Sequence, residues 1–261
     1  MAGKVFSGNV RITPVNVLGV AIAGAIGLLN TVKCELVTPA PENIDQISRQ
    51  NGTVGQLVSR AQVPKPVTLN LQIDDTTDQR VLAYALNGVA VGYSQSSHTA
   101  VAVAYNAPAT LGDSIPLGYR HVSSVLVKDV TDATTYSDVT DYLVDPVSGF
   151  IQVLASGIIT ANQVLHIGFT AAVIAGSTVR GSTVASNLLR IEVQLQDLVD
   201  GSEGYFVCPI FQASSSGNQD LFGKAMLVAG LGGAMFLPPA GSAAYTETGG
   251  APYILTSIDP S

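Results

Sequence analysis

Charged residues are scarce in this chain of 261 residues. Only 12% of the residues are Asp, Glu, Lys or Arg, about half of the usual quarter. A folded monomer of this length would expose roughly 11,000 Å², so the 12 basic and 19 acidic residues would leave on the order of 350 Å² for each charge. Because 47% of the residues are hydrophobic, we expect a surface that is uncharged and polar or covered by other subunits, and not a freely diffusing monomer.

Further absences argue against several classes of function. Trp is absent, which disfavours aromatic cages and Trp-anchored sugar sites. Lys and Arg form no run, and the net charge of −7 opposes nucleic-acid binding as the main activity, since phosphate contacts need clustered basic residues. The mean hydropathy of +0.36 disfavours disorder.

The two cysteines, Cys34 and Cys208, form no metal or redox motif by their spacing. We expect two buried, reduced thiols that behave as small hydrophobic residues. A single long-range disulfide is the alternative.

One apolar run near the N-terminus, Val17–Leu29, invites a membrane interpretation. It is too short to cross a bilayer, which needs about 20 residues. Lys4 and Arg11 precede it as in a secretory signal, but no small-x-small cleavage site follows, and Lys33 is unsuited to a lipoprotein signal. The sequence therefore predicts a buried or subunit-covered segment, with no membrane partner.

Strict alternation of apolar and polar residues predicts β-strands. It is clearest in Val67–Asp74 and Leu189–Gln196, where every second side chain would face a core. Gly204–Gln212 is expected to pair with Leu189–Gln196, and Asp145–Gly149 to form a hairpin turn. Further candidate strands are Val122–Asp129, Tyr142–Val144, Phe150–Leu154, Gln163–Ala172, Ala225–Ala229 and Ala234–Leu237, the last two being separate strands or one strand bent at Gly230, Gly232 and Gly233.

One helix is predicted over Asp78–Leu86, capped by Thr77 or Asp78 and ended by Gly88, with Val81, Leu82 and Ala85 on one face. A weaker helical turn is predicted at Gly217–Phe222. The fold class is therefore mainly β, with two packed antiparallel sheets, one flanking α-helix and long loops.

Two long segments lack a core pattern. Pro39–Pro66 is rich in Pro and Gly and is predicted to be a loop, with Glu42–Arg49 as a candidate helical turn. Pro238–Ser261 is predicted to be a C-terminal arm. Loops beyond about 15 residues usually bind something, so both are candidates for intersubunit arms.

A search for chemistry assigns no catalytic, metal-binding or cofactor-binding residue. His98, His121 and His166 are not at metal-ligand spacing from other candidate ligands, and His166 is expected to be a core or interface residue. No Gly-x-Ser-x-Gly elbow or Walker loop occurs, and Gly230–Gly233 lacks the third glycine of a dinucleotide loop. The Asp-rich stretch 129–145 lacks an EF-hand register and is expected to form solvated edges and turns. We predict that the protein is not an enzyme and needs no cofactor.

The order of these features resembles a known family. Gly3–Leu29 leads into a strand at Val32–Val37, the Pro-rich loop follows, and Pro66–Leu71 precedes the predicted helix. The block Val127–Ile151 and the pair Leu189–Leu198 and Tyr205–Phe211, joined by Val199–Gly201, complete the pattern. In this respect the chain is similar to the tail tube (major tail) proteins of long-tailed bacteriophages.

The resemblance implies a structural virion protein, made in the bacterial host cytoplasm and located in the tail. Members form hexameric rings that stack by helical assembly into a hollow tube, whose inner strands join into one barrel around the tape measure protein. DNA passes through the lumen during ejection without specific binding. The implied partners are other copies of the chain, the tape measure protein, the tail terminator, and tail tip or baseplate proteins.

The resemblance also divides the chain. Residues 1–116 and 176–261 would form the tail tube core, and residues 117–175 a β-rich, outward-facing insertion. The long loop would reach the next ring through Glu42, Ile44, Asp45, Arg49 and Arg60. Because a negative wall repels phosphates, Asp74, Asp75 and Glu192 are candidate lumen-facing acids.

Other functions remain open from the sequence. A different virion β-protein, such as a decoration, baseplate or connector component, would share the composition. A secreted carbohydrate-binding or adhesive β-sandwich is less favoured because Trp is absent and the signal sequence is poor.

Overall fold

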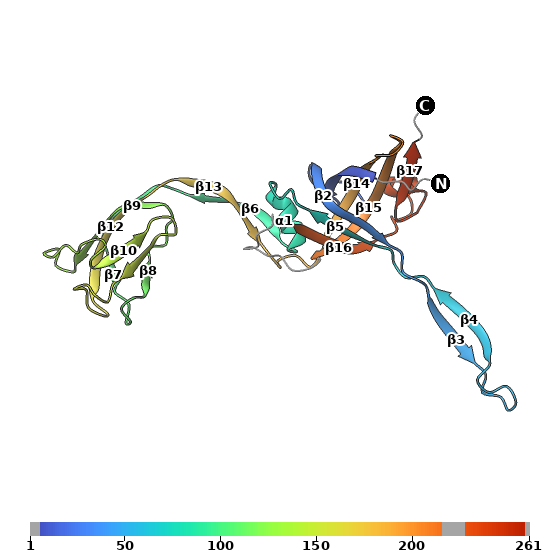
Figure 1. The fold of residues 1–261 in the computed structure, drawn as a ribbon, viewed down its shortest axis with the longest axis horizontal. Helices are drawn as coiled ribbons and strands as arrows, with labels where there is room; N and C mark the ends of the chain where they lie inside the picture. Colours follow the sequence, from blue (N-terminus) through green and yellow to red (C-terminus); the bar gives the residue numbers. More distant parts are fainter. Residues whose placement is uncertain (1–5, 216–227, 259–261) are drawn as a thin grey trace. The chain divides into compact units, whose positions relative to one another are not determined.

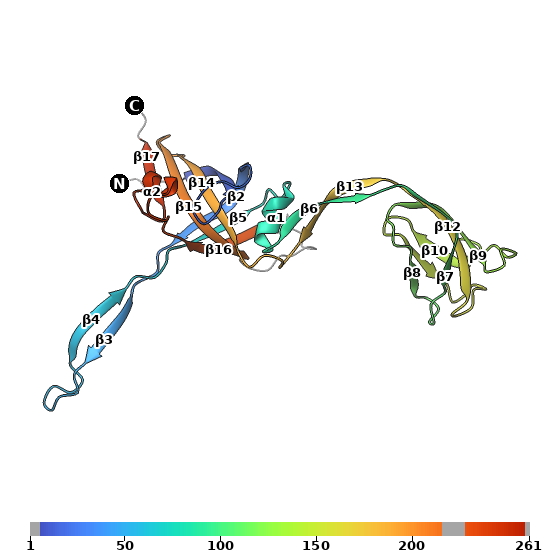
Figure 2. The same cartoon turned by 180° about the vertical axis from the view of Figure 1, so that it is seen from behind.

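The computed structural model describes residues 6–215 and 228–258. The fold is mainly β, with 54% strand and 5% helix, and its sheets are antiparallel, as predicted. The chain divides into two compact units (Figures 1 and 2). Unit 1 takes the chain up to Val91 and again from Val179, and unit 2 takes Gly92–Thr178. Unit 2 thus contains the predicted insertion 117–175 but begins earlier, at Gly92.

Unit 1 is built on a closed barrel. Its sheet has the order β14-β1-β2-β5-β16-β15-β17, and β15 also pairs with β14, so the first six strands form a closed ring of pairings. Closure removes the exposed edges of those strands. The strands are β1 (Phe6–Pro14), β2 (Ile26–Val37), β5 (Thr68–Ile73), β14 (Asn187–Asp197), β15 (Glu203–Ser215), β16 (Ala229–Met235) and β17 (Ile254–Ile258).

The barrel interior is filled by the alternating apolar residues that the sequence predicts. Leu69, Leu71 and Ile73 of β5 are buried, as are Leu189, Ile191 and Val193 of β14, a pattern that follows from the period of two along a strand. β14 pairs with β15 as expected, with Ile191 opposite Cys208 and Val193 opposite Phe206. These residues belong to one hydrophobic core.

The glycines of β16 lie within one strand, so Ala229 and Ala234 do not belong to two separate strands, contrary to one of the predicted alternatives. Gly233 pairs with Ala213 of β15, and a Cβ added at Gly233 would overlap the carbonyl oxygen of Gln212. Glycine is therefore needed here for the close approach of two backbones. Residues 225–227 of the predicted strand lie outside the described residues.

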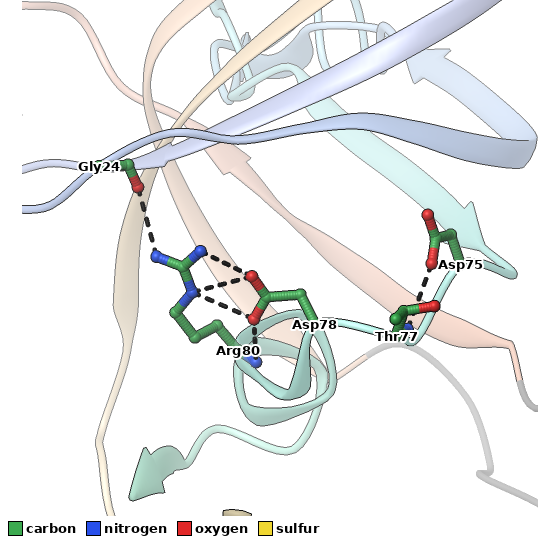
Figure 3. A network of polar contacts seen from close by, with 5 residues as sticks. All are labelled: Gly24, Asp75, Thr77, Asp78 and Arg80. Atoms are coloured by element: carbon green, nitrogen blue, oxygen red, sulfur yellow. Dashed lines mark hydrogen bonds and ion pairs between the residues drawn. The ribbon is translucent and has the colours of Figure 1, made fainter.

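The predicted helix is present as α1 (Gln79–Ala85). Its N-cap is Asp78, whose side chain accepts a hydrogen bond from the backbone N–H of Arg80, and Asp75 accepts one from the N–H of Thr77 just before it (Figure 3). Val81 and Ala85 are buried as expected, but Ala83 is buried in place of Leu82. The helix packs against β15 and β16. The helical turn predicted at 217–222 lies outside the described residues.

The prediction of a loop over Pro39–Pro66, with a helical turn at Glu42–Arg49, is wrong. This segment forms an antiparallel hairpin of β3 (Glu42–Ile47) and β4 (Leu57–Val63). The prolines flank the hairpin instead of interrupting it, and Gly52 and Gly55 take the positive φ angles of its turn. The two strands form a sheet of their own, visible in both views of the ribbon (Figures 1 and 2).

The C-terminal segment after Pro238 folds back onto unit 1, whereas we expected an arm reaching another subunit. It contains a short helix, α2 (Ala243–Thr248), capped by Ser242 and ended by Gly249. β17 then pairs with β15, with Phe206 opposite Leu255. Its described residues therefore belong to unit 1, where β17 extends the same sheet outside the closed ring.

Unit 2 has two small sheets around its own core. One sheet has the order β7-β12-β9 and the other β10-β11-β8, and residues of both, such as Ile167 and Val153, share one hydrophobic cluster. The predicted hairpin is confirmed, because Asp145 accepts a bond from the N–H of Val147 between β10 and β11. The strands are β7 (His98–Asn106), β8 (Ser114–Pro116), β9 (Val122–Asp129), β10 (Tyr142–Asp145), β11 (Phe150–Val153) and β12 (Val164–Ala171).

β6 (Val89–Gln95) and β13 (Ile174–Arg180) carry the chain out of and back into unit 1 and pair with each other.

Candidate functional site

The β3–β4 hairpin is exposed throughout both strands and carries large apolar side chains. Every residue of β3 and β4 is solvent-exposed. A globular protein normally buries one face of a hairpin, and a lone two-stranded hairpin is at best marginally stable in water. The exposed apolar side chains of this hairpin, including its turn, are Ile44, Ile47, Val54, Leu57, Val58 and Val63.

The polar residues of the hairpin pair with one another across the strands. Asp45 lies opposite Arg60 and accepts two hydrogen bonds from its guanidinium, at 2.7 and 3.0 Å. This contact lowers the pKa of the Asp45 carboxyl below its ordinary value. Lys65 lies 3.8 Å from Glu42 at the base of the hairpin. Four of the charged side chains of the hairpin are therefore paired with one another, and its exposed apolar side chains form the surface that favours burial against another molecule.

Of the five residues predicted for the long loop, the structure brings Asp45 and Arg60 together. Glu42 and Ile44 lie on β3, and Arg49 lies exposed in the connection to β4. The sequence prediction missed the neighbouring apolar residues Ile47 and Val58. The dipeptide Asn51-Gly52, a common hairpin turn, is the signal that could have identified the two strands.

The three predicted lumen-facing acids lie in separate networks. Asp74 and Asp75 come just after β5 and not on its polar face, because the strand ends at Ile73. Asp74 accepts hydrogen bonds of 2.8 and 2.9 Å from the side chain of Asn30. Glu192 lies on β14 and is largely covered, since it bonds Arg190 at 2.7 Å and lies 3.7 Å from Arg11. Glu192 is therefore not an isolated negative charge.

Arg190 joins β14 to the C-terminal helix. Its guanidinium binds Glu192 and also Glu247 of α2, with an Nη1–Oε2 distance of 2.6 Å. The hydrogen bond from Arg190 lowers the pKa of Glu247 and the same contact raises the pKa of Arg190. The pair attaches α2 to the barrel wall.

In unit 2, the acidic stretch mostly shapes turns. Asp141 is buried, contrary to the expectation of solvated acids, and accepts bonds from the N–H groups of Ser137 and Ile158. Asp132 lies 3.0 Å from the partly covered ring of His166. Asp138, Asp141 and Asp145 therefore bind backbone N–H groups, whereas Asp132 contacts a side chain of β12.

Both cysteines are free thiols. Cys208 is buried as expected, and burial raises its pKa to about 12. Cys34 is exposed, so its prediction as a buried residue is wrong. The reason is local: Cys34 lies on the part of β2 beyond Asn30, where pairing with β1 has ended.

Candidate metal ligands do not cluster within the described ranges 6–215 and 228–258. Within them, no three His, Cys, Asp or Glu side chains come close enough to hold a metal ion. No helix in those ranges has the length and apolar character to span a membrane. The most distinctive surface thus remains the hairpin.

Comparison with known families places this hairpin within a defined group. Residues 5–180 match the family described as "Protein of unknown function UCP028589". The chain belongs to this family. The UCP028589 match includes β1, the hairpin, α1 and all of unit 2, and it ends before β14. No curated protein matches the chain.

Proposed function

We propose that this protein is a structural subunit that assembles with copies of itself into stacked rings and so builds the tube of a long-tailed bacteriophage tail. The observation that carries the proposal is the β3–β4 hairpin, which exposes six large apolar side chains and forms a two-stranded sheet without a further strand from the part of the chain that the structure describes. Such a surface favours burial against another molecule.

The proposal also accounts for the low charge of the chain. Contacts between subunits that persist for the life of an assembly are large and relatively apolar. A subunit inside such an assembly needs few charges for solubility, because much of its surface never faces water. The resemblance of the sequence to tail tube proteins supplies the identity of the assembly and its partners, the tape measure protein and passing DNA.

The closed barrel suits a wall. It gives each subunit a stable body in which six strands pair in a closed ring, so growth would occur through the hairpin and not through pairing at the edges of those six strands. In this role the hairpin of one ring contacts the next ring, with Asp45 and Arg60 keeping its two strands in register.

Deletion of the hairpin tests this proposal. Replacing Ile44–Arg60 with a short Gly-Ser turn should leave folded rings that no longer stack, because the apolar contact is lost while the barrel is intact. Negative-stain microscopy distinguishes stacked tubes from single rings, and Arg49→Ser, which keeps the hairpin and its apolar side chains, is the control.

Two results would contradict the proposal in different ways. If the deletion variant polymerised like the unmodified protein, the role of the hairpin would be wrong. If the unmodified protein stayed monomeric at high concentration, the assembly role itself would be wrong.

A further inference from the structure

A second apolar surface lies at the turn between β1 and β2. Between Val15 and Ala25 the chain carries no charged residue. Four of its large apolar side chains keep between 49% and 68% of their surface exposed; they are Val17, Leu18, Val20 and Ile22. Contiguous exposed apolar residues of this kind mark interaction sites. We call residues 17–22 the β1–β2 turn.

The β1–β2 turn is held by contacts of its own residues and of the residues that flank it. The Asn16 side chain accepts hydrogen bonds from the N–H groups of Leu18 and Val20, at 2.9 and 3.0 Å. At Gly19 a Cβ would lie 2.8 Å from the Cβ of Ala244, so the turn packs closely against α2.

On its other flank, Arg80 donates to the carbonyl oxygen of Gly24 at 3.5 Å (Figure 3). Arg80 is itself held by Asp78, the N-cap of α1. The turn is therefore preorganised, and its burial against a partner would cost little conformational entropy.

An uncharged, largely apolar groove of about 590 Å³ lies in the same unit. It contains the side chains of Val32, Cys34, Leu36, Leu195, Phe206 and Leu255, and none of its lining residues is charged. We call it the barrel groove. Pairing of β2 with β1 ends at Asn30, so the next part of β2 keeps an apolar face uncovered; Val32 is 61% exposed.

The turn and the groove lie toward opposite ends of β1. Ser7, Gly8 and Val10 near the start of β1 line the groove. The turn, in contrast, follows Pro14, the last residue of β1. The six residue steps from Gly8 to Pro14 span roughly 20 Å at about 3.3 Å per residue. Because both are fixed in the same barrel, the turn of one copy cannot fill its own groove.

We propose that the β1–β2 turn of one copy inserts into the barrel groove of a second copy of this chain. Both surfaces are uncharged and apolar, and each is presented by every copy. Two different patches at opposite ends of a strand give a head-to-tail contact, which can repeat from copy to copy. This inference rests on the proposed function, since it names a contact through which copies would stack.

Cross-linking through a native thiol tests the contact directly. Val17→Cys places a thiol on the turn, and Cys34 supplies one in the groove. Cys208 is buried and does not compete. A short bismaleimide should link Cys34 of one copy to the new thiol of the next, giving a ladder on a denaturing gel and a linked peptide pair by mass spectrometry.

Matched controls separate this contact from random collision. Val173→Cys places a thiol at a residue of unit 2 that is 71% exposed, close to the 68% of Val17, and should give at least about tenfold less ladder. Adding Cys34→Ser to Val17→Cys should abolish the specific link.

A second variant tests the same contact without a reagent. Replacing both Val17 and Val20 with Ser should weaken self-association by at least about tenfold in analytical ultracentrifugation, because two apolar side chains lose their burial. The thermal midpoint of the monomeric unit should stay unchanged, and Val173→Ser should change neither measurement.

The outcomes separate this inference from the proposed function. Rings or tubes without the link between the turn and Cys34 would overturn the inference alone. A specific link in short chains that never form tubes would support it and overturn the tail tube role. Monomers at high concentration with no link would overturn both.

Discussion

The two separate cores predict that a cavity in the barrel destabilises unit 1 alone. Phe211 on β15 is fully buried in the core of unit 1, while the core of unit 2 is made of other residues, such as Leu165 and Phe169. Phe211→Ala removes a buried aromatic ring from a closely packed interior. Substitutions of this kind cost about 3–5 kcal/mol in the free energy of unfolding.

This cost translates into a measurable shift. With a dependence of about 2 kcal/mol per molar urea, the unfolding midpoint of unit 1 should fall by about 2 M. Hydrogen exchange with mass spectrometry at increasing urea concentrations reports peptides from the two units separately. Peptides from β14 and β15 should lose protection at lower urea, and peptides from β12 should keep the midpoint of the unmodified protein.

Leu198→Ala is the control, because Leu198 belongs to unit 1 but is 65% exposed and its loss should change the midpoint little. If Phe211→Ala shifted the peptides of both units together, the cores would unfold as one and the reasoning would fail. An unchanged midpoint for unit 1 would contradict the burial of Phe211.

Two further predictions concern polar contacts. Gln95 in unit 2 is buried and bonds the carbonyl oxygens of Arg120 and Ala172, at 2.8 and 2.9 Å; Gln95→Leu leaves both without this donor and should cost about 3 kcal/mol, measured as a lower urea midpoint for unit 2. Arg190 lowers the pKa of Glu247 from its ordinary 4.5, so the stability from this pair is complete above that pH and is lost as the pH falls through the lowered pKa. Glu247→Gln should remove this part of the acid sensitivity, seen in thermal unfolding from about pH 3 to about pH 7, and an unchanged pH profile would contradict it.

Strands that bury at least one face, such as β5, β14 and β15, could be predicted from the sequence, and the exposed strands β3 and β4 could not. β5 and β14 alternate because their polar side chains face away from a core. The hairpin strands are exposed on both faces, so burial imposes no alternation on them. β7 alternates Ala with Val (Ala100–Ala104), which gives little polar contrast, and unit 2 was therefore predicted to begin too late.

The site residues were predictable only in part, for a related reason. Asp45 and Arg60 could be placed in the long segment, but their pairing depends on the hairpin register. Asp74 was assigned to a strand face although β5 ends one residue earlier. Glu192 was predicted to lie on the solvated face of its strand. Its partner Arg11 is far away in the sequence and comes close only through the pairing of β1 with β14, so the sequence alone does not show this contact.

The neighbouring strands β6 and β13 have a practical consequence for engineering. The outgoing strand β6 and the returning strand β13 are hydrogen-bonded neighbours. All residues between them therefore form a single insertion between two barrel strands. A short turn, a fluorescent reporter or a foreign antigen could occupy the same interval without rerouting any barrel strand. The interval between β6 and β13 is thus a graft point at which a foreign sequence can be inserted into the chain.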